Sequence, residues 1–292
     1  MKQKLKLAVA CMHSEPGDIK GNLRRTESMV AEASERGADW VCFPELSLTG
    51  YVLENPERIY DDIPPDALIA SVTGMARDYG MLVMAGFAEF SGAPGRPYIT
   101  QIVAAKSGLL GSHRKTHLAP PEKALYRPGN QIQVFRDRGI CFGLQLCYEV
   151  HFPEISTVMA LKGADLIIMP HASPRGLPEG KIKSWLRHLP GRAFDNGLFV
   201  VAFNQVGRTR GGLSFPGVIL AISPVGRILE QYGGEHEKLT VLTLDAADLH
   251  HVRDHKMRYF LPERRPELYG ELLAEGRIPD ADGPVHERIP SP

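Results

Sequence analysis

The stretch GICFGLQLCYEVHFPE, residues 139–154, decides the fold class, because a strand, a cysteine and a helix start follow one another within it. Its alternating apolar side chains predict a buried strand that ends beside Cys147. Pro153 then begins a predicted helix over 153–162. Cys147 therefore lies at a strand-to-helix corner, where a sheet edge exposes side chains and a helix start favours a thiolate. A lone buried cysteine is more often structural, so the residues around Cys147 have to show whether it is structural or catalytic.

Strand and helix signals alternate along the rest of the chain, which predicts an α/β fold with a mixed sheet and helices packed outside it. The predicted helices cover 20–36, 65–79, 153–162 and 180–195. The predicted strands cover 5–12, 39–43, 81–90, 97–105, 108–113, 164–169, 198–204 and 239–244, and a further hairpin covers 215–230 with its turn at Pro224-Val225-Gly226.

Two segments of the chain are similar to each other and suggest two related halves. GADWVCFPEL (37–46) and GADLIIMPHA (163–172) share Gly-Ala-Asp, an apolar strand and a proline. Short similarities of this kind also arise by chance, or from the same way of entering a strand. If the halves are related, Glu45 and His171 occupy matching positions at the ends of matching strands.

Charge and hydropathy exclude several classes of partner. Lys plus Arg and Asp plus Glu are both 34, so no basic surface for nucleic acid or anionic lipid is predicted. No stretch approaches the roughly 18 apolar residues of a membrane span, which predicts a protein without membrane contact. A small neutral or zwitterionic ligand is the expected partner.

A single domain over 1–275 is predicted, because no linker or charge block divides the chain. The tail over 276–292 is rich in Pro, Asp and Gly and is expected to be mobile or to cross a subunit interface. The four cysteines show no disulfide or CxxC spacing, which is typical of a reduced, cytoplasmic protein. His250, His251 and His255 suggest a metal site, since His251 and His255 are four residues apart, but no HExxH motif or third ligand accompanies them, so no metal is predicted.

Three polar residues each end a predicted strand, so one sheet edge can bring them together: Glu45, Lys115 and Cys147. This group suits acyl transfer, because an ammonium lowers the pKa of a nearby thiol and a carboxylate can take the thiol proton. The Lys115 ammonium and the backbone N–H of Tyr148 can then stabilise the oxyanion. Glu122, in the same loop as Lys115, is expected to orient the lysine or the hydrolytic water.

Here the chain resembles the nitrilase or carbon–nitrogen hydrolase superfamily over nearly its whole length. The matching segments are FPELSLTGY, RKTHL with EKALYRPG, GLQLCYEVHFPE, GRAFDNGLFVVAFNQVG and VRDHKMRYFLPERRPELY. The resemblance implies a four-layer α-β-β-α sandwich, a triad of Glu45, Lys115 and Cys147 with Glu122 as a fourth member, no cofactor, and a homodimer or larger homo-oligomer.

A substrate pocket is expected around these residues. His171 and Ser173 follow a strand end, and Arg175 is available for an anionic group. Tyr51 and Glu149 are also expected to line this pocket.

Departures from the family pattern bear on the substrate. Amidase branches commonly place arginine where His151 stands, and carbamoyl-amino-acid branches use arginines just after the cysteine; this chain has neither. Ile219 and Ser223 stand where the family often has Ser and Asp. Tyr148 looks more like amidases than like true nitrilases, which tend to carry tryptophan there.

The leading hypothesis is a thiol amidohydrolase that cleaves a non-peptide C–N bond of a small linear amide or N-carbamoyl compound and releases ammonia or an amine. A nitrilase that converts a nitrile to the acid is the nearest alternative. A catalytically silent scaffold of the same fold is a second alternative, although it would have no reason to keep the four site residues. A papain-like protease with His171 or His188 as base is a third.

Overall fold

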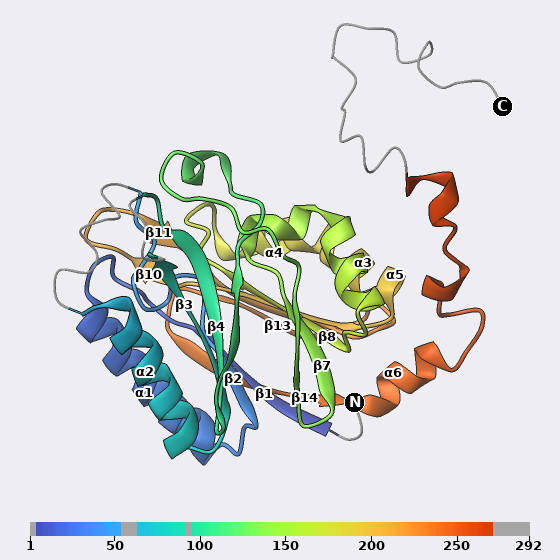
Figure 1. The fold of residues 1–292 in the computed structure, drawn as a ribbon, viewed down its shortest axis with the longest axis horizontal. Coiled ribbons are helices and arrows are strands. Elements are labelled where there is room, and N and C mark those ends of the chain that lie inside the picture. The colour runs from blue at the N-terminus through green and yellow to red at the C-terminus, as the bar shows by residue number, and fades with distance from the viewer. Residues whose placement is uncertain (1–3, 54–62, 91–94, 271–292) are drawn as a thin grey trace, which may run out of the picture.

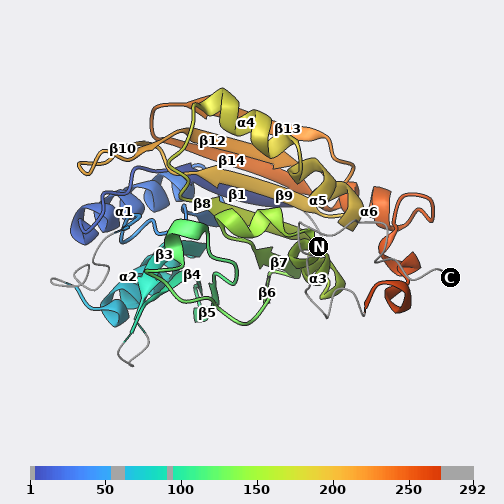
Figure 2. The ribbon, with the colours of Figure 1, turned by 90° about the horizontal axis from the view of Figure 1, so that it is seen from above.

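The fold is built on two six-stranded sheets that lie face to face, with helices on both outer surfaces (Figure 1). The structure is a computed structural model that describes residues 4–53, 63–90 and 95–270. In the view from above, the two helical layers lie on opposite sides of the paired sheets (Figure 2). The expected four-layer α-β-β-α sandwich is therefore confirmed.

The first sheet has the strand order β14-β1-β2-β3-β4-β5. Its central strands β1, β2 and β3 are parallel, and the other strands pair antiparallel. The bounds are β1 Lys4–Cys11, β2 Trp40–Cys42, β3 Leu82–Glu89, β4 Tyr98–Ala105, β5 Gly108–Arg114 and β14 Lys238–Asp245.

The second sheet has the order β13-β12-β9-β8-β7-β6. Here β7, β8 and β9 are parallel and the other strands pair antiparallel. The bounds are β6 Val134–Asp137, β7 Ile140–Leu144, β8 Leu166–His171, β9 Phe199–Asn204, β12 Gly217–Ile222 and β13 Ile228–Gly234, and a separate pair is formed by β10 Gly207–Arg208 and β11 Ser214–Phe215.

Helices connect the parallel strands and cover the outer faces. Asp18 begins the first helix by accepting the N–H of Gly21 at 3.0 Å, which satisfies one of the free donors of a helix start. Prolines stand in the first turn of the next four helices, where a missing N–H costs nothing. The bounds are α1 Ile19–Glu35, α2 Pro65–Asp78, α3 Pro153–Leu161, α4 Pro178–Leu186, α5 Leu189–Asn196 and α6 Ala246–Arg253.

The two halves of the chain repeat one order of elements. In each half, three parallel strands joined by helices lead into an antiparallel hairpin, and an antiparallel edge strand (β14 or β6) lies beside the first strand. Within this repeat β2 matches β8, so Glu45, just after β2, matches His171, the last residue of β8. The suggestion of two related halves is confirmed at the level of topology.

Apolar side chains fill three layers, one between the sheets and one beneath each helical layer. The middle layer contains Trp40, whose ring lies 4.7 Å from that of Phe142 in the opposite sheet. The indole N–H of Trp40 donates to Asp137 Oδ2 at 2.7 Å, which adds a polar link between the two sheets. The sheets are thus held in a fixed relation, and side chains from both can meet at one site.

Most predicted elements are present, although α6 and the short pair β10 and β11 were not predicted, and two further differences follow. The helix predicted over 180–195 is two helices, α4 and α5, because Pro190 in the first turn of α5 disfavours helical backbone just before it. Strand β6 was missed, since four residues carry too short a pattern. The predicted tail over 276–292 lies outside the described residues.

No helix among the described residues is long and apolar enough to cross a membrane.

Candidate active site

Glu45 follows β2 and is held in place by its backbone and by its carboxylate. Its carbonyl oxygen accepts from Gln205 Nε2 at 2.8 Å, and Oε2 accepts from the N–H of Ala172 at 3.0 Å. The next residue, Leu46, has φ 55°, a left-handed conformation that costs energy for a residue other than glycine. A Cβ at Gly86 would lie 2.5 Å from Leu46 N, so only glycine lets β3 approach this turn. The carboxylate therefore points to a fixed place.

Lys115 follows β5 and is completely buried. Its backbone N–H donates to Ile99 O and its carbonyl accepts from Gly129 N, both at 2.8 Å, so the start of the loop is anchored. Lys115 Nζ donates to Glu45 Oε1 at 2.7 Å and to Glu122 Oε1 at 2.9 Å. One ammonium thus bridges two carboxylates that come from distant parts of the chain.

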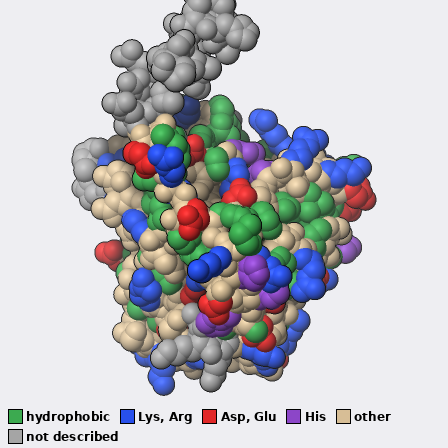
Figure 3. All heavy atoms as spheres, turned by 90° about the vertical axis from the view of Figure 1, so that its right-hand side faces the viewer, with side chains coloured by type: hydrophobic (Ala, Val, Ile, Leu, Met, Phe, Trp, Pro, Cys, Tyr) green, Lys and Arg blue, Asp and Glu red, His purple; other side chains and the backbone are tan. Residues whose placement is uncertain are grey.

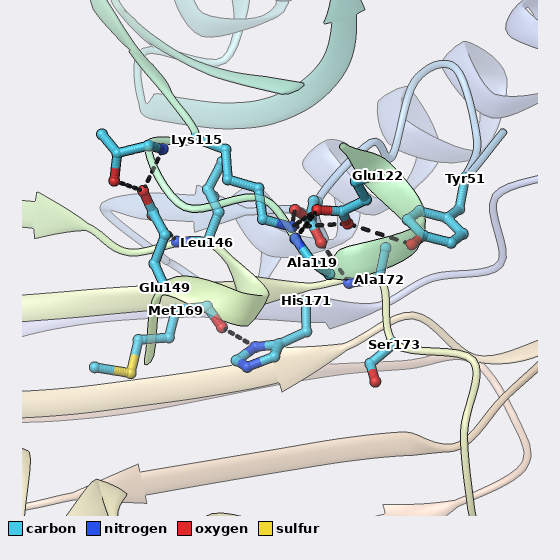
Figure 4. Close-up of polar contacts among 12 residues, drawn as sticks. Tyr51, Lys115, Ala119, Glu122, Leu146, Glu149, Met169, His171, Ala172 and Ser173 are labelled. Atoms are coloured by element: carbon cyan, nitrogen blue, oxygen red, sulfur yellow. Dashed lines mark hydrogen bonds and ion pairs between the residues drawn. The ribbon is translucent and has the colours of Figure 1, made fainter. Parts of the chain in front are cut away.

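Glu122 ends a short 3-10 turn, Pro120–Glu122, and is also buried. Its Oε2 accepts from Ala119 N at 2.7 Å, and Tyr51 donates its hydroxyl hydrogen to Oε1 at 3.3 Å. Figure 4 shows Lys115 reaching toward Glu122, with Tyr51 on the other side of that carboxylate. Both carboxylate oxygens of Glu122 accept hydrogen bonds, so the carboxylate is fixed in a position that orients the Lys115 ammonium.

Charges in this cluster move the pKa values of its members. Burial raises the pKa of Glu45 to about 7; the ammonium of Lys115 works against this shift and Glu122 adds to it. Burial by itself would lower the pKa of Lys115, but the charges of Glu45, Cys147 and Glu122 raise it well above its usual value. Near neutral pH, Lys115 is therefore an ammonium and Glu45 exchanges a proton readily.

Cys147 lies three residues beyond the end of β7 and begins a 3-10 turn, Cys147–His151. The helix α3 starts at Pro153, as predicted, but a 3-10 turn separates Cys147 from it, so the helix start does not lie directly beside the thiol. Cys147 has φ 42°, a strained conformation of the kind that active sites often hold. Its side chain is partly exposed and lines a cavity.

The expected resting thiolate is not supported by the charges around Cys147. Burial raises the pKa of the thiol and the carboxylate of Glu45 raises it further, while Lys115 lowers it only in part. Cys147 therefore rests as a thiol beside a carboxylate whose pKa is near 7.

The cavity beside Cys147 has a volume of about 590 Å³. Four of the five predicted pocket residues line it, namely Tyr51, His171, Ser173 and Arg175. Tyr148, predicted to supply an oxyanion N–H, lines it too. The remaining lining residues are Leu53, Ala119, Pro120, Pro121, Glu122, Cys147, Val150, His151, Ala172, Pro174, Lys181, Ser184, Trp185 and Leu213.

Glu149 does not line this cavity, and its prediction as a pocket residue is wrong. Its carboxylate points away from the cavity, where Oε2 accepts from Leu146 N at 2.6 Å and lies 3.0 Å from His113 Nε2. Oε1 accepts from Thr116 N at 2.7 Å (Figure 4). Burial opposes ionisation, but His113 and these hydrogen bonds lower the pKa of Glu149 to about 2. Glu149 is a buried anion that joins the Cys147 turn to the Lys115 loop.

His171 forms a wall of the cavity. Its Nδ1 lies 2.8 Å from Met169 O, and its ring lies 4.5 Å from the ring of Trp185. Burial lowers the pKa of His171 well below its usual value, so the ring is neutral. With Nδ1 protonated to donate to Met169, Nε2 is an acceptor without a partner among the described residues.

Sequence reasoning missed the contribution of α4. Lys181, Ser184 and Trp185 line the cavity from one face of this helix, three and four residues apart. The spacing is visible in the sequence, but nothing there says that this face meets the cavity instead of solvent.

Among the described residues, no group of three or more His, Cys, Asp or Glu side chains is arranged to hold a metal ion. Histidine side chains are visible on the face shown in Figure 3, where they lie interspersed with basic and acidic groups. His250 and His251 lie on α6, and His251 Nε2 lies 2.6 Å from Arg258 Nη1. A cation at that distance disfavours a metal ligand.

A family model described as carbon-nitrogen hydrolase matches residues 6–254. The chain belongs to the carbon-nitrogen hydrolase family. It is an enzyme of the class that acts on carbon–nitrogen bonds other than peptide bonds, as the predicted resemblance implied.

Curated relatives of this hydrolase carry several names. It is 31% identical over 275 residues to a protein named nitrilase from Pyrococcus abyssi, and the alignment covers 91% of this chain and 99% of that relative. It is 30% identical to an (R)-stereoselective amidase from a Pseudomonas species (91% and 94% covered). It is 25% identical to an N-carbamoylputrescine amidase from Solanum lycopersicum (93% and 96% covered).

The chain is also similar to solved structures of an amidase. An amidase from Nesterenkonia sp. AN1 superposes on the hydrolase with a TM-score of 0.78 at 31% identity, covering 92% of this chain and 99% of that one. Another structure of that amidase shows the result of Michael addition of acrylamide at its active-site cysteine.

Proposed function

We propose that this hydrolase is a cysteine amidohydrolase that cleaves a small linear amide or N-carbamoyl compound through a thioester. The observation that carries the proposal is the buried Lys115 ammonium bridging Glu45 and Glu122 beside the cavity that Cys147 lines. Such a cluster provides a nucleophile, a proton acceptor with a pKa near 7 and a fixed positive charge, which are the groups that acyl transfer requires.

In the first half-reaction, Glu45 takes the thiol proton as Cys147 Sγ forms a bond to the carbonyl carbon. The carbonyl oxygen becomes an oxyanion, which the Lys115 ammonium and the Tyr148 N–H stabilise. The C–N bond then breaks, and the proton on Glu45 passes to the nitrogen, which leaves as ammonia or an amine. A thioester remains on Cys147.

In the second half-reaction, Glu45 accepts a proton from water as the water oxygen attacks the thioester carbon. The C–S bond breaks, the proton on Glu45 returns to sulfur, and the acid leaves. Glu122 takes no part in these proton transfers, because Lys115, Tyr51 and Ala119 occupy its oxygens. Its task is to hold the Lys115 ammonium in place.

Two observations support a small amide or carbamoyl substrate. A cavity of about 590 Å³ accepts a small molecule. The similar proteins include amidases and an N-carbamoylputrescine amidase. A nitrile is a second candidate, because the relative from Pyrococcus abyssi is named nitrilase.

Ammonia release from a panel of small amides, carbamoyl amino acids and nitriles tests the proposal. We expect turnover of amides or carbamoyl compounds by the native enzyme and a loss of at least about 10³-fold in kcat/KM for Cys147→Ala and Lys115→Ala. Tyr126→Phe, a buried change outside the catalytic cluster, controls for folding. Full activity of Lys115→Ala would favour a cysteine–histidine protease. Acid formed from a nitrile without amide accumulation would identify a nitrilase, and no turnover would favour the silent scaffold.

A further inference from the structure

We propose that Lys181, assisted by Arg175, binds a carboxylate of the substrate, so that the enzyme prefers small amides or carbamoyl compounds that carry a carboxylate at the other end. This inference rests on the proposed function, because it assigns the substrate class of the same cavity. Both cations line that cavity, Lys181 from α4 and Arg175 from the segment that follows β8.

Lys181 is held in position at the cavity wall. Its ammonium donates to Ser173 Oγ. Ser173 is fixed in turn by Asn204, whose Oδ1 accepts the Ser173 N–H at 2.9 Å and whose Nδ2 donates to the Ser173 carbonyl at 3.1 Å. Asn204 is fully buried and also donates to Pro216 O at 2.9 Å. Because its hydrogen-bond partner Ser173 is fixed, the Lys181 ammonium has a defined position at the cavity wall.

The charge of Lys181 is not balanced within the protein. Among the described residues, no carboxylate lies within ion-pair distance of its ammonium, and its hydrogen-bond partner Ser173 is neutral. Burial lowers the pKa of Lys181; Cys147 opposes this shift, and the positive charge of Arg175 adds to it. Because a partly buried, unpaired cation is costly, an anion entering the cavity is stabilised there.

The carboxylates near the cavity are already engaged. Glu45 and Glu122 both bind Lys115, and Glu149 points away toward His113. Among the described residues, the charged side chains that line the cavity without a partner of opposite charge are therefore positive. A substrate with an ammonium at its far end would meet like charges, whereas a carboxylate would meet Lys181 and Arg175.

The subsite lies close to the reacting groups. Ala172 donates its N–H to Glu45 Oε2, and the Oγ of the next residue, Ser173, accepts from the Lys181 ammonium. Ala172 and Ser173 lie next to each other in Figure 4. The bridge from the Glu45 carboxylate to the Lys181 ammonium thus passes through two consecutive residues. A short substrate is therefore expected to reach from Cys147 to this subsite.

A different assignment would place Lys181 in the chemistry, as a second cation for the Cys147 thiolate. The two assignments differ in one measurable respect. A carboxylate-binding lysine affects the ratio of kcat/KM between charged and neutral substrates, whereas a thiolate-stabilising lysine affects all substrates alike.

The test uses matched substrates that differ only in the far end: succinamate, pentanamide and 4-aminobutanamide, with N-carbamoyl-β-alanine, N-butylurea and N-(3-aminopropyl)urea as the carbamoyl series. We expect the native enzyme to favour the anionic over the neutral member by roughly 10- to 100-fold in kcat/KM, with the cationic member lowest. Lys181→Met should remove most of this preference, and Arg175→Met a smaller part.

Lys183→Met is the matched control, because Lys183 lies on the same helix, is exposed and is not among the cavity residues. Its preference should equal that of the native enzyme. Lys181→Glu should raise the cationic member above the anionic one. An equal loss on all three substrates in Lys181→Met, or no preference in the native enzyme, would overturn the inference.

Binding to Cys147→Ala separates this inference from the proposed function. Calorimetry on that variant should show tighter binding of succinamate than of pentanamide, and the difference should vanish when Lys181→Met is added. A cavity that prefers the carboxylate without any turnover by the native enzyme would contradict the proposed function alone. Turnover combined with equal binding of both amides would contradict the carboxylate subsite alone.

Discussion

At the scale of single residues, the environment of Glu45 decides how the site works. Its carboxylate is completely buried, yet one oxygen lies 2.7 Å from an ammonium and the other accepts a backbone N–H. Burial raises its pKa to about 7, and the positive charge beside it keeps the ionised form accessible. A carboxyl group with such a pKa can both take and return a proton near neutral pH.

The pH dependence of kcat/KM should report Glu45. Below the pKa of about 7 the group is protonated and cannot accept the thiol proton of Cys147, so activity should fall about tenfold per pH unit on the acid side. Steady-state rates between about pH 5 and 8 with a neutral amide measure this. A plateau in kcat/KM down to about pH 5 would contradict Glu45 as the base.

At the scale of elements, the site depends on the short turn Cys147–His151, which α3 follows. Glu149 fixes this turn, since its two oxygens accept from Leu146, Thr116 and His113. The turn follows β7, whereas Thr116 belongs to the loop that follows β5 in the other sheet. A buried carboxylate therefore locks the nucleophile turn to the lysine loop.

Replacing Glu149 by Gln should destabilise the protein and misplace Cys147. One carboxylate oxygen becomes an NH2 group that faces N–H donors, so the free energy of unfolding should fall by about 3 kcal/mol, as expected for breaking a buried ion pair. Urea unfolding and kcat measure the two effects. Glu154→Gln, an exposed change at the start of α3, is the control. An unchanged kcat would show that the turn holds Cys147 without this carboxylate.

At the scale of the whole molecule, the proposed catalytic cluster takes its residues from segments that follow strands of both sheets. Glu45 and Lys115 follow strands of the first sheet, while Cys147 and His171 belong to the second. The apolar layer between the sheets, with Trp40 donating to Asp137 across it, keeps these edges together. The active site is thus a property of the packed sandwich and not of either sheet alone.

Trp40→Phe should lower the free energy of unfolding by about 1–3 kcal/mol, through the lost hydrogen bond to Asp137 and the smaller ring. Because the chain has two tryptophans, this variant leaves Trp185 on α4 as the only fluorescent reporter. Trp185 fluorescence, circular dichroism and activity should be lost in one urea transition at a lower midpoint. Phe194→Leu, an exposed change on α5, is the control. Separate transitions would mean that the sheets unfold independently.

Much of this organisation was predictable from local patterns. The alternation of apolar residues predicted a mixed sheet with helices outside it, because strand burial depends on side chains two residues apart. The repeated GAD segments suggested two halves, and the four-layer arrangement was implied by the family resemblance. The placement of Glu45, Lys115 and Cys147 at strand ends predicted that they could meet. Separate motifs spread over the chain identified the family.

The sequence by itself determined the order of elements, the family and the four residues of the reacting cluster, since each follows from local periodicity or a short motif. Only the tertiary structure decided that Glu149 turns away from the cavity, that Cys147 rests as a thiol, and that one face of α4 supplies Lys181. These depend on burial and on charges from residues far apart in the chain. Distances and desolvation of that kind exist only once the two sheets have packed.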